Sequence, residues 1–419
     1  MNIHALVAKF KSEFFIVLLA NIFSYFIAFS GSVIYVRLLG KSDFGLYTFA
    51  FNIISLFLLV NGFGAASGVL QYVSRAKNPS EQLNYLRFAF HGGMVFNLAI
   101  GVCIVGYALL MPLPLPAARP ILLAMALFPV GRLYIDIFQS FFRATGQNKL
   151  QAEFSILNNA LLLLVNVIGI VAFKLYGLIY FTYLGYGIML LFSAWKIKLP
   201  KLFTTFSYPA IKIREFISYS FFTTLSNAFS GLLFVLDIII IGYVVKDSQL
   251  IAIYRVATII PFAINFIPNI AVNYYYPEFA KNADNPAKIR ALARWVSLRM
   301  FLFSGTVSLL LIILAQPLIN LIFGHGYNQS VLPFQIISFG YWIIATFRTV
   351  NGNIIAALGK AKLSFYLTAV ILSTNIGITY FMVLKYSIVG AACAVVFMYG
   401  FSSLIGYLTL KILLRAKER

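Results

Sequence analysis

The chain has 419 residues, of which 61% are hydrophobic and only 10% are charged. A protein that folds in water carries about 25% charged residues, so this composition excludes an ordinary soluble domain and indicates that lipid is the solvent. The formal net charge of +21 would suit nucleic-acid binding. However, the basic residues are dispersed over short polar connections and form no patch, so we expect no nucleic acid partner.

Twelve apolar segments follow one another along the chain. Each is about 20 residues long or more, which is the length of a helix that crosses a bilayer core of roughly 30 Å. None shows the strict alternation of a membrane strand. The expected spans are 14–36, 44–64, 87–111, 121–142, 150–173, 177–195, 215–243, 249–275, 296–322, 331–356, 363–384 and 389–411. The first is longer than the apolar core of a signal peptide, so we expect it to stay in the protein.

The basic residues predict how these helices are oriented. With the N-terminus inside, 22 of the 32 Lys and Arg residues fall on the inner side, six on the outer side and four within or near the spans. Short inner loops of membrane proteins are enriched in Lys and Arg. We therefore expect a multi-pass membrane protein with both termini in the cytoplasm, and the resemblance described below implies the bacterial inner membrane.

The second half of the chain repeats features of the first. ATGQNKL at 144–150 resembles AALGKAKL at 356–363, which places Gly146 and Gly359 213 residues apart, and the same offset relates Gly177 to Gly390. A chance match of small apolar segments is the alternative. A repeat in the same orientation predicts an all-α protein of two pseudo-symmetric six-helix bundles around a central cavity. The expected domains are 1–205 and 206–419, joined by a basic linker at 196–214.

Three spans carry polar residues along one helical face, and we expect these faces to line the cavity. In 14–36, 215–243 and 249–275 respectively, the sets are Asn21, Tyr25, Ser32 and Tyr35; Ser220, Thr223, Asn227, Ser230 and Asp237; and Arg255, Thr258, Asn265 and Asn269. A charge at the bilayer centre costs on the order of 3 kcal/mol, so the ionisable members are candidates for a site.

Each charged candidate has a plainer alternative. Arg132 and Asp136 are one helical turn apart, so they could neutralise each other as a structural pair instead of binding substrate. Arg348 has no carboxylate three or four residues away, so it either pairs with another helix or offers its charge to the cavity. Asp237 is a candidate for ion coupling, with solvation at the outer end of its span as the alternative.

Several motifs at helix ends resemble one superfamily of exporters. They are RLLGKSDFGLY at 37–47, FFRATGQNK at 141–149, the aspartate before IIIIGY, PLINLIFGHGY at 317–327 and AALGKAKL at 356–363. In this order they resemble the multidrug, oligosaccharidyl-lipid and polysaccharide exporter superfamily, and particularly its polysaccharide branch of O-antigen flippases, often called Wzx.

The resemblance implies a function in O-antigen and lipopolysaccharide biosynthesis. The substrate would be a glycan on undecaprenyl diphosphate, flipped across the bilayer by alternating access, with a polysaccharide polymerase and chain-length machinery as partners. The anionic head group would be held by Arg255, Arg348 and Arg132, since Arg is suited to bidentate phosphate contacts. Asn and Tyr side chains would bind the sugars.

Two other functions are weighed against flipping. A multidrug or small-cation exporter of the same superfamily would need more intramembrane carboxylates. A membrane-embedded polymerase or ligase would need a large outer loop, which the sequence lacks. The three histidines and two cysteines do not cluster, and the chain has no nucleotide-binding or nucleophile motif. We therefore expect no enzyme activity, no metal and no cofactor.

Overall fold

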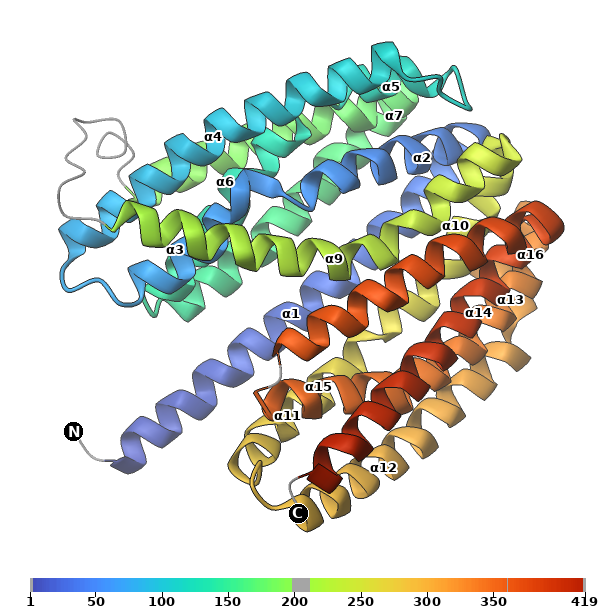
Figure 1. Cartoon of the computed structure of the whole chain (residues 1–419). Coiled ribbons are helices and arrows are strands. Elements are labelled where there is room, and N and C mark those ends of the chain that lie inside the picture. Colours follow the sequence, from blue (N-terminus) through green and yellow to red (C-terminus); the bar gives the residue numbers. More distant parts are fainter. Residues whose placement is uncertain (1–2, 198–211, 360, 417–419) are drawn as a thin grey trace. The chain divides into compact units, whose positions relative to one another are not determined.

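The computed structural model describes residues 3–197, 212–359 and 361–416, and helices make up nearly all of this part (Figure 1). In lipid a helix satisfies every backbone N–H and C=O group within one segment, which is why such apolar segments become helices. Within the described residues no strand is present, so the all-α expectation is confirmed. The expected linker 196–214 lies mostly outside the described ranges.

The chain divides into two compact units, Met1–Gly231 and Leu232–Arg419. The first unit holds α1 Ile3–Leu39, α2 Lys41–Leu58, η1 Asn61–Gly64, α3 Ala65–Val73, α4 Pro79–Leu110, α5 Ala118–Ala124, α6 Phe128–Ala144, α7 Asn148–Ile197 and the first part of α9 Ile213–Val245. The second holds the rest of α9, α10 Ser248–Ile264, α11 Phe266–Lys281, α12 Pro286–Ile313, α13 Ala315–Ile322, η2 His325–Ser330, α14 Val331–Ile343, η3 Ile344–Arg348, α15 Thr349–Ala357 and α16 Ala361–Ala416.

The units divide within α9 rather than in the polar segment before it. Phe216 in the first part of α9 is buried in an aromatic cluster with Tyr72 and Tyr85 of the first unit. This apolar packing places the first part of α9 in the first unit.

The long helices α7 and α16 are each two antiparallel spans joined by a tight turn. Lys174 in α7 (φ 52°, ψ −131°) and Ser387 in α16 (φ 52°, ψ −134°) have left-handed φ values that reverse the chain. Across the turn of α7, the Thr182 hydroxyl donates to the Asn166 amide oxygen at 3.0 Å. Eight single helices and two bent pairs are long and apolar enough to span a membrane, and α7 and α16 each count twice. The described residues are therefore consistent with the twelve expected spans.

The internal repeat is visible in the backbone. Gly146 and Gly359 both have φ of +73°. The turn residues Lys174 and Ser387 are also 213 residues apart and share their dihedral angles to within a few degrees. Such agreement is not expected of a chance alignment of apolar segments, so the repeat belongs to the fold.

A second register relates the helices that begin after the first long polar turn of each half. Asn78 caps α4 by accepting from the Glu81 N–H, and Asn285 caps α12 by accepting from the Lys288 N–H. Each cap is followed by proline at the first helical position. The two caps are 207 residues apart, so the repeat extends into these helices with a short change of register.

The span expected at 44–64 differs from the structure. The helix is interrupted at Asn61–Gly64, where Gly62, Phe63 and Gly64 have φ of 54°, 52° and 77°, and it then continues to Val73. These left-handed values break the helical hydrogen-bond ladder inside the span. The sequence signal, a Gly-Phe-Gly step, reads equally well as the end of a helix.

Candidate functional site

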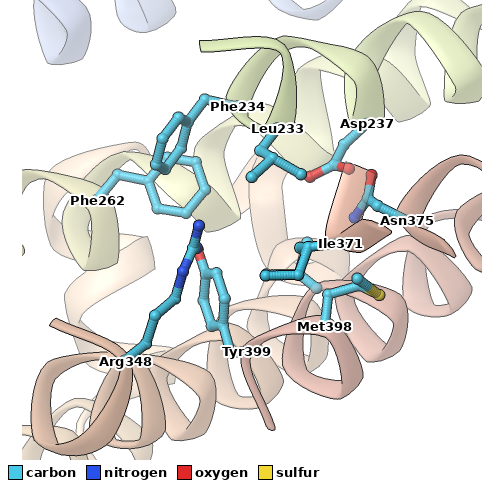
Figure 2. A pocket seen from close by; sticks show the side chains of 10 residues that line it. Leu233, Phe234, Asp237, Phe262, Arg348, Ile371, Asn375, Met398 and Tyr399 are labelled. Carbon is cyan, nitrogen blue, oxygen red and sulfur yellow. The ribbon is translucent and has the colours of Figure 1, made fainter. Parts of the chain in front are cut away.

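A small pocket in the second unit brings together two of the predicted charged residues. Asp237 from α9 and Arg348 from the end of η3 both line it, and α16 contributes Asn375 and Tyr399 (Figure 2). The other lining residues are apolar: Leu233, Phe234, Phe262, Ile371, Val395 and Met398. An aspartate and an arginine therefore share an otherwise apolar pocket.

Asp237 is buried, with 6% of its surface exposed, and is not solvated at the end of its helix. The Tyr254 hydroxyl donates to its Oδ2 at 3.3 Å, but its Oδ1 has no hydrogen-bond partner. Figure 2 shows the Asn375 amide next to this carboxylate, and the amide oxygen of Asn375 is also buried without a partner. Buried acceptors without donors are costly, so this corner of the pocket suits a proton or a small cation.

Arg348 ends a short π-helical turn, Ile344–Arg348. The Thr349 hydroxyl donates to the Ile344 carbonyl five residues earlier, at 3.0 Å, which fits this wider turn. Such turns inside membrane helices frequently occur at functional sites. Within the ranges that the structure describes, no carboxylate lies within ion-pair distance of Arg348, and its guanidinium lies beside Tyr399 and Phe262 (Figure 2).

The pocket volume limits what it holds in this conformation. It is about 20 Å³, which is room for a single water-sized species. A diphosphate does not fit beside Arg348 unless α9, α16 or the π-helical turn moves. The geometry therefore permits ion binding at Asp237 here, and anion binding at Arg348 only after the pocket opens.

The other predicted residues of the second unit lie near this pocket but are not part of it. Arg255 is on α10, one residue after the Tyr254 that contacts Asp237, and its carbonyl accepts from the Thr258 hydroxyl at 2.7 Å. Asn265 ends α10, and its amide oxygen is buried without a partner. Asn269 is exposed and donates to the Asn265 carbonyl at 2.8 Å.

Arg132 and Asp136 form an ion pair in the first unit. Arg132 Nε lies 3.0 Å from Asp136 Oδ1, with side-chain exposures of 50% and 27%. The Asn61 amide also donates to Asp136 at 3.0 Å. The structural pair considered from the spacing is thus present, while a substrate role for Arg132 stays a prediction.

The same polar network stabilises the interrupted helix. The fully buried Asn97 of α4 accepts from the Gly62 N–H at 2.7 Å and donates to both Asn61 Oδ1 and the Pro129 carbonyl at 2.6 Å. These bonds replace helical bonds that the interruption removes, which lipid could not do.

The remaining predicted cavity residues belong to the first unit. Asn21, Tyr25 and Asn227 are exposed there, and their substrate role stays a prediction. The side chain of Ser230 lies outside the described residues.

Sequence reasoning missed Asn375, Tyr399, Asn97 and Asn61. Each is a neutral residue in an apolar segment, so it lacks the charge that makes Asp237 and Arg348 stand out in the sequence. The signal that could have found the three asparagines is an amide in a span, since a buried amide needs a partner in lipid.

The chain resembles known proteins over most of its length. Residues 10–283 match the polysaccharide biosynthesis protein family. An uncharacterized membrane protein of Methanocaldococcus jannaschii is 23% identical over 423 aligned positions, which cover 90% of this chain and 80% of the relative.

Two solved structures show the same fold. The lipid II flippase MurJ in an inward closed conformation has a TM-score of 0.76 at 15% identity, and covers 94% of this chain and 87% of its own. An inward-facing multidrug resistance MATE transporter of the MOP superfamily has a TM-score of 0.74 at 13% identity. The match covers 94% of this chain and 95% of the transporter. The chain thus has the MOP-superfamily fold, the predicted resemblance is confirmed, and the protein belongs to the polysaccharide biosynthesis protein family.

Proposed function

We propose that this protein flips a lipid-linked oligosaccharide, carried on undecaprenyl diphosphate, from the cytoplasmic to the outer leaflet of the bacterial inner membrane. Membership of the polysaccharide biosynthesis family and the lipid II flippase fold support this function. The observation that carries it is Arg348, an arginine in a membrane span with no carboxylate within ion-pair distance in the described part of the chain. A cation left in that position suits an anionic head group.

The other predicted site residues bind either the diphosphate head group or the sugars of the substrate. Arg255, the residue after Tyr254 on α10, and Arg132 supply further positive charge for the diphosphate. Asn21, Tyr25, Asn227, Asn265 and Asn269 supply hydrogen bonds for a glycan. The polyprenyl chain, which is apolar, stays in lipid throughout.

The membrane potential drives the step. An inside-negative potential favours outward movement of negative charge. Two negative charges that cross a potential of about 100 mV release roughly 5 kcal/mol, at about 2.3 kcal/mol per charge. No ATP site is needed for a gradient of this size. An ion that returns through Asp237 adds to this driving force.

The direct test is flipping in liposomes that contain purified protein and a fluorescent undecaprenyl-diphosphate oligosaccharide. Transfer is read as the fraction of fluorophore that becomes accessible to an impermeant quencher. Arg348→Gln should slow transfer by roughly 10- to 100-fold, because a charge-assisted hydrogen bond contributes about 1.5–3 kcal/mol. Arg348→Lys should retain part of the rate.

The matched control is Arg119→Gln, which removes an exposed arginine of α5. It should transfer at the rate of the unaltered protein. If Arg348→Gln also flips at that rate, Arg348 does not hold the head group. If the unaltered protein flips no lipid-linked glycan, the proposed function is wrong.

One observation favours a second function, export of small organic cations. Asp237 has a carboxylate oxygen without a partner, and Phe234, Phe262 and Tyr399 line the same pocket. Aromatic faces and a carboxylate together attract cations. Uptake of a fluorescent organic cation into inverted vesicles, abolished by Asp237→Asn, by a protein that transfers no lipid-linked glycan would assign the protein to this function.

A further inference from the structure

The second unit has a larger pocket that is separate from the Asp237 and Arg348 pocket. Its volume is about 510 Å³, within the range of small-molecule sites. Four basic residues line it, two one turn apart near the start of α12 and two one turn apart at the end of α16: Arg290, Arg294, Lys411 and Arg415. We call these residues and the volume they enclose the basic pocket.

The walls of the basic pocket contain no acidic residue that could neutralise its positive charges. For Arg294, Lys411 and Arg415, the described part of the chain offers no carboxylate within ion-pair distance. Like charges four residues apart on a helix are destabilising by a few tenths of a kcal/mol per pair. Lys411 and Arg415 form such a like-charge pair at the end of α16, and an anion bound between them and Arg294 would offset their repulsion.

The remaining walls fit a ligand that is partly hydrocarbon. Phe347, Leu410 and Leu414 are apolar, whereas Ser297 and Asn351 can hydrogen-bond to an oxygen. An inorganic anion would use only the basic and polar groups. A phosphate ester on a lipid would use both parts of the pocket.

The position of the pocket in its unit supports a lipid. Figure 1 shows the start of α12 and the last turns of α16 at the same end of the second unit. The distribution of Lys and Arg along the chain predicts that this end faces the cytoplasm. Anionic head groups are abundant in that leaflet and bind basic pockets between membrane helices.

The repeat shows that the fold does not require a positive charge at position 290. In the register that relates Asn78 to Asn285, Arg290 corresponds to Leu83, which packs against the apolar core of the first unit. Arg294 corresponds to Arg87. The same helix is therefore built with an apolar residue at this position in one unit and with an arginine in the other.

We infer that the basic pocket binds the phosphate group of an anionic lipid, with Arg294, Lys411 and Arg415 as the phosphate ligands. This inference does not depend on the proposed flipping activity. The shared chemistry is a phosphate ester on a hydrocarbon. It has two sources, a phospholipid of the bilayer and an isoprenyl diphosphate.

The test is equilibrium binding to the purified full-length chain in an uncharged detergent, measured by titration calorimetry. The probes are dioctanoyl phosphatidylglycerol, dioctanoyl phosphatidylcholine, farnesyl diphosphate and inorganic pyrophosphate. Arg294→Gln with Lys411→Gln should weaken binding of the anionic lipids at least tenfold, about 1.4 kcal/mol. Arg294→Lys with Lys411→Arg, which keeps both charges, should stay within about threefold and excludes loss of fold as the cause.

The matched control is Lys281→Gln with Lys288→Gln. Both lysines are exposed, lie in the second unit and do not line the pocket, and the change in net charge is the same. Binding by the control should change less than about twofold, since only distant charges differ. An equal loss of binding affinity in the control and pocket variants would overturn the inference, because electrostatic attraction by the net charge of the protein would then explain binding.

The four probes distinguish the sources. Tighter binding of phosphatidylglycerol supports the inference with a bilayer phospholipid as occupant, and tighter binding of farnesyl diphosphate supports it with an isoprenyl diphosphate. Pyrophosphate binding as tightly as either lipid would overturn the lipid assignment, and so would equal binding of phosphatidylcholine. Because no transport is measured, a protein that fails to flip glycans can still pass this test.

Discussion

Asp237 is the residue whose environment differs most from that of a solvated side chain. It is buried, one carboxylate oxygen has only the Tyr254 hydroxyl, and the other has no partner. The nearby Asn375 adds a second buried oxygen without a donor. Two such acceptors in one small pocket attract a proton or a small cation, which would couple that ion to the state of the pocket.

We predict that Asp237→Asn removes the dependence of transport on a proton or sodium gradient. The amide keeps the size of the carboxylate but cannot exchange a proton and binds cations weakly. The measurement is glycan transfer in liposomes with imposed proton or sodium gradients. Full transfer with unchanged gradient dependence in the variant would show that Asp237 does not couple an ion.

The charged residues of this pocket could be found from the sequence, but its neutral residues could not. Asp237 and Arg348 are recognisable because a charge in a span is costly and therefore rare. Asn375 and Tyr399 carry no charge and are less conspicuous in the sequence, and their approach depends on how α9, η3 and α16 pack. That packing follows from side-chain shape over many residues, which periodicity does not describe.

The two helical hairpins, α7 and α16, show how closely the elements of each unit approach. A Cβ atom added at Gly177 would overlap the carbonyl oxygen of Gly169, and one added at Gly390 would overlap that of Met382. Each pair lies on the two arms of one hairpin. Glycine at these positions lets the arms meet at the turn, which any larger residue would force apart.

We predict that Gly177→Ala and Gly390→Ala each destabilise the protein by about 1–3 kcal/mol, the usual effect of overpacking. Gly187→Ala in α7 and Gly377→Ala in α16 are matched controls, because their added methyl groups meet no atom within 4 Å. Alanine is also the better helix former by up to about 1 kcal/mol, so the controls should be neutral or stabilising. The readout is the midpoint temperature of unfolding in detergent. Equal effects at all four positions would contradict the close approach.

At this scale the sequence predicted helix number better than helix continuity. The apolar lengths of α4, α9 and α16 are unambiguous, and the glycine repeat located both hairpin turns. The interruption at Asn61–Gly64 was not predicted, because it depends on Asn97 supplying hydrogen bonds from another helix. A local pattern cannot reveal a partner 35 residues away.

At the scale of the whole molecule, twelve spans would place both chain ends on one side of the membrane. The distribution of basic residues predicts that this is the cytoplasmic side. The described residues contain the helices for all twelve crossings only if α7 and α16 are each counted as two.

We predict that alkaline phosphatase fused after Pro114 is active, and that a green fluorescent protein fused after Arg419 is fluorescent. The phosphatase folds only outside the cytoplasm, and the fluorescent protein folds when it stays inside. Reciprocal fusions, with the reporters exchanged, are the controls and should both be inactive. Phosphatase activity at Arg419 would show an odd number of crossings or the opposite orientation.

The turns at Lys174 and Ser387 have the same backbone conformation in the two halves of the chain. Two unrelated hairpins have no reason to share these dihedral angles at one fixed separation. The shared angles are what duplication of one six-helix unit would produce, so each half can be used as a reference for the other. Positions that differ between the halves, such as Leu83 against Arg290, are where a variant that restores the residue of the other half tests what the difference does.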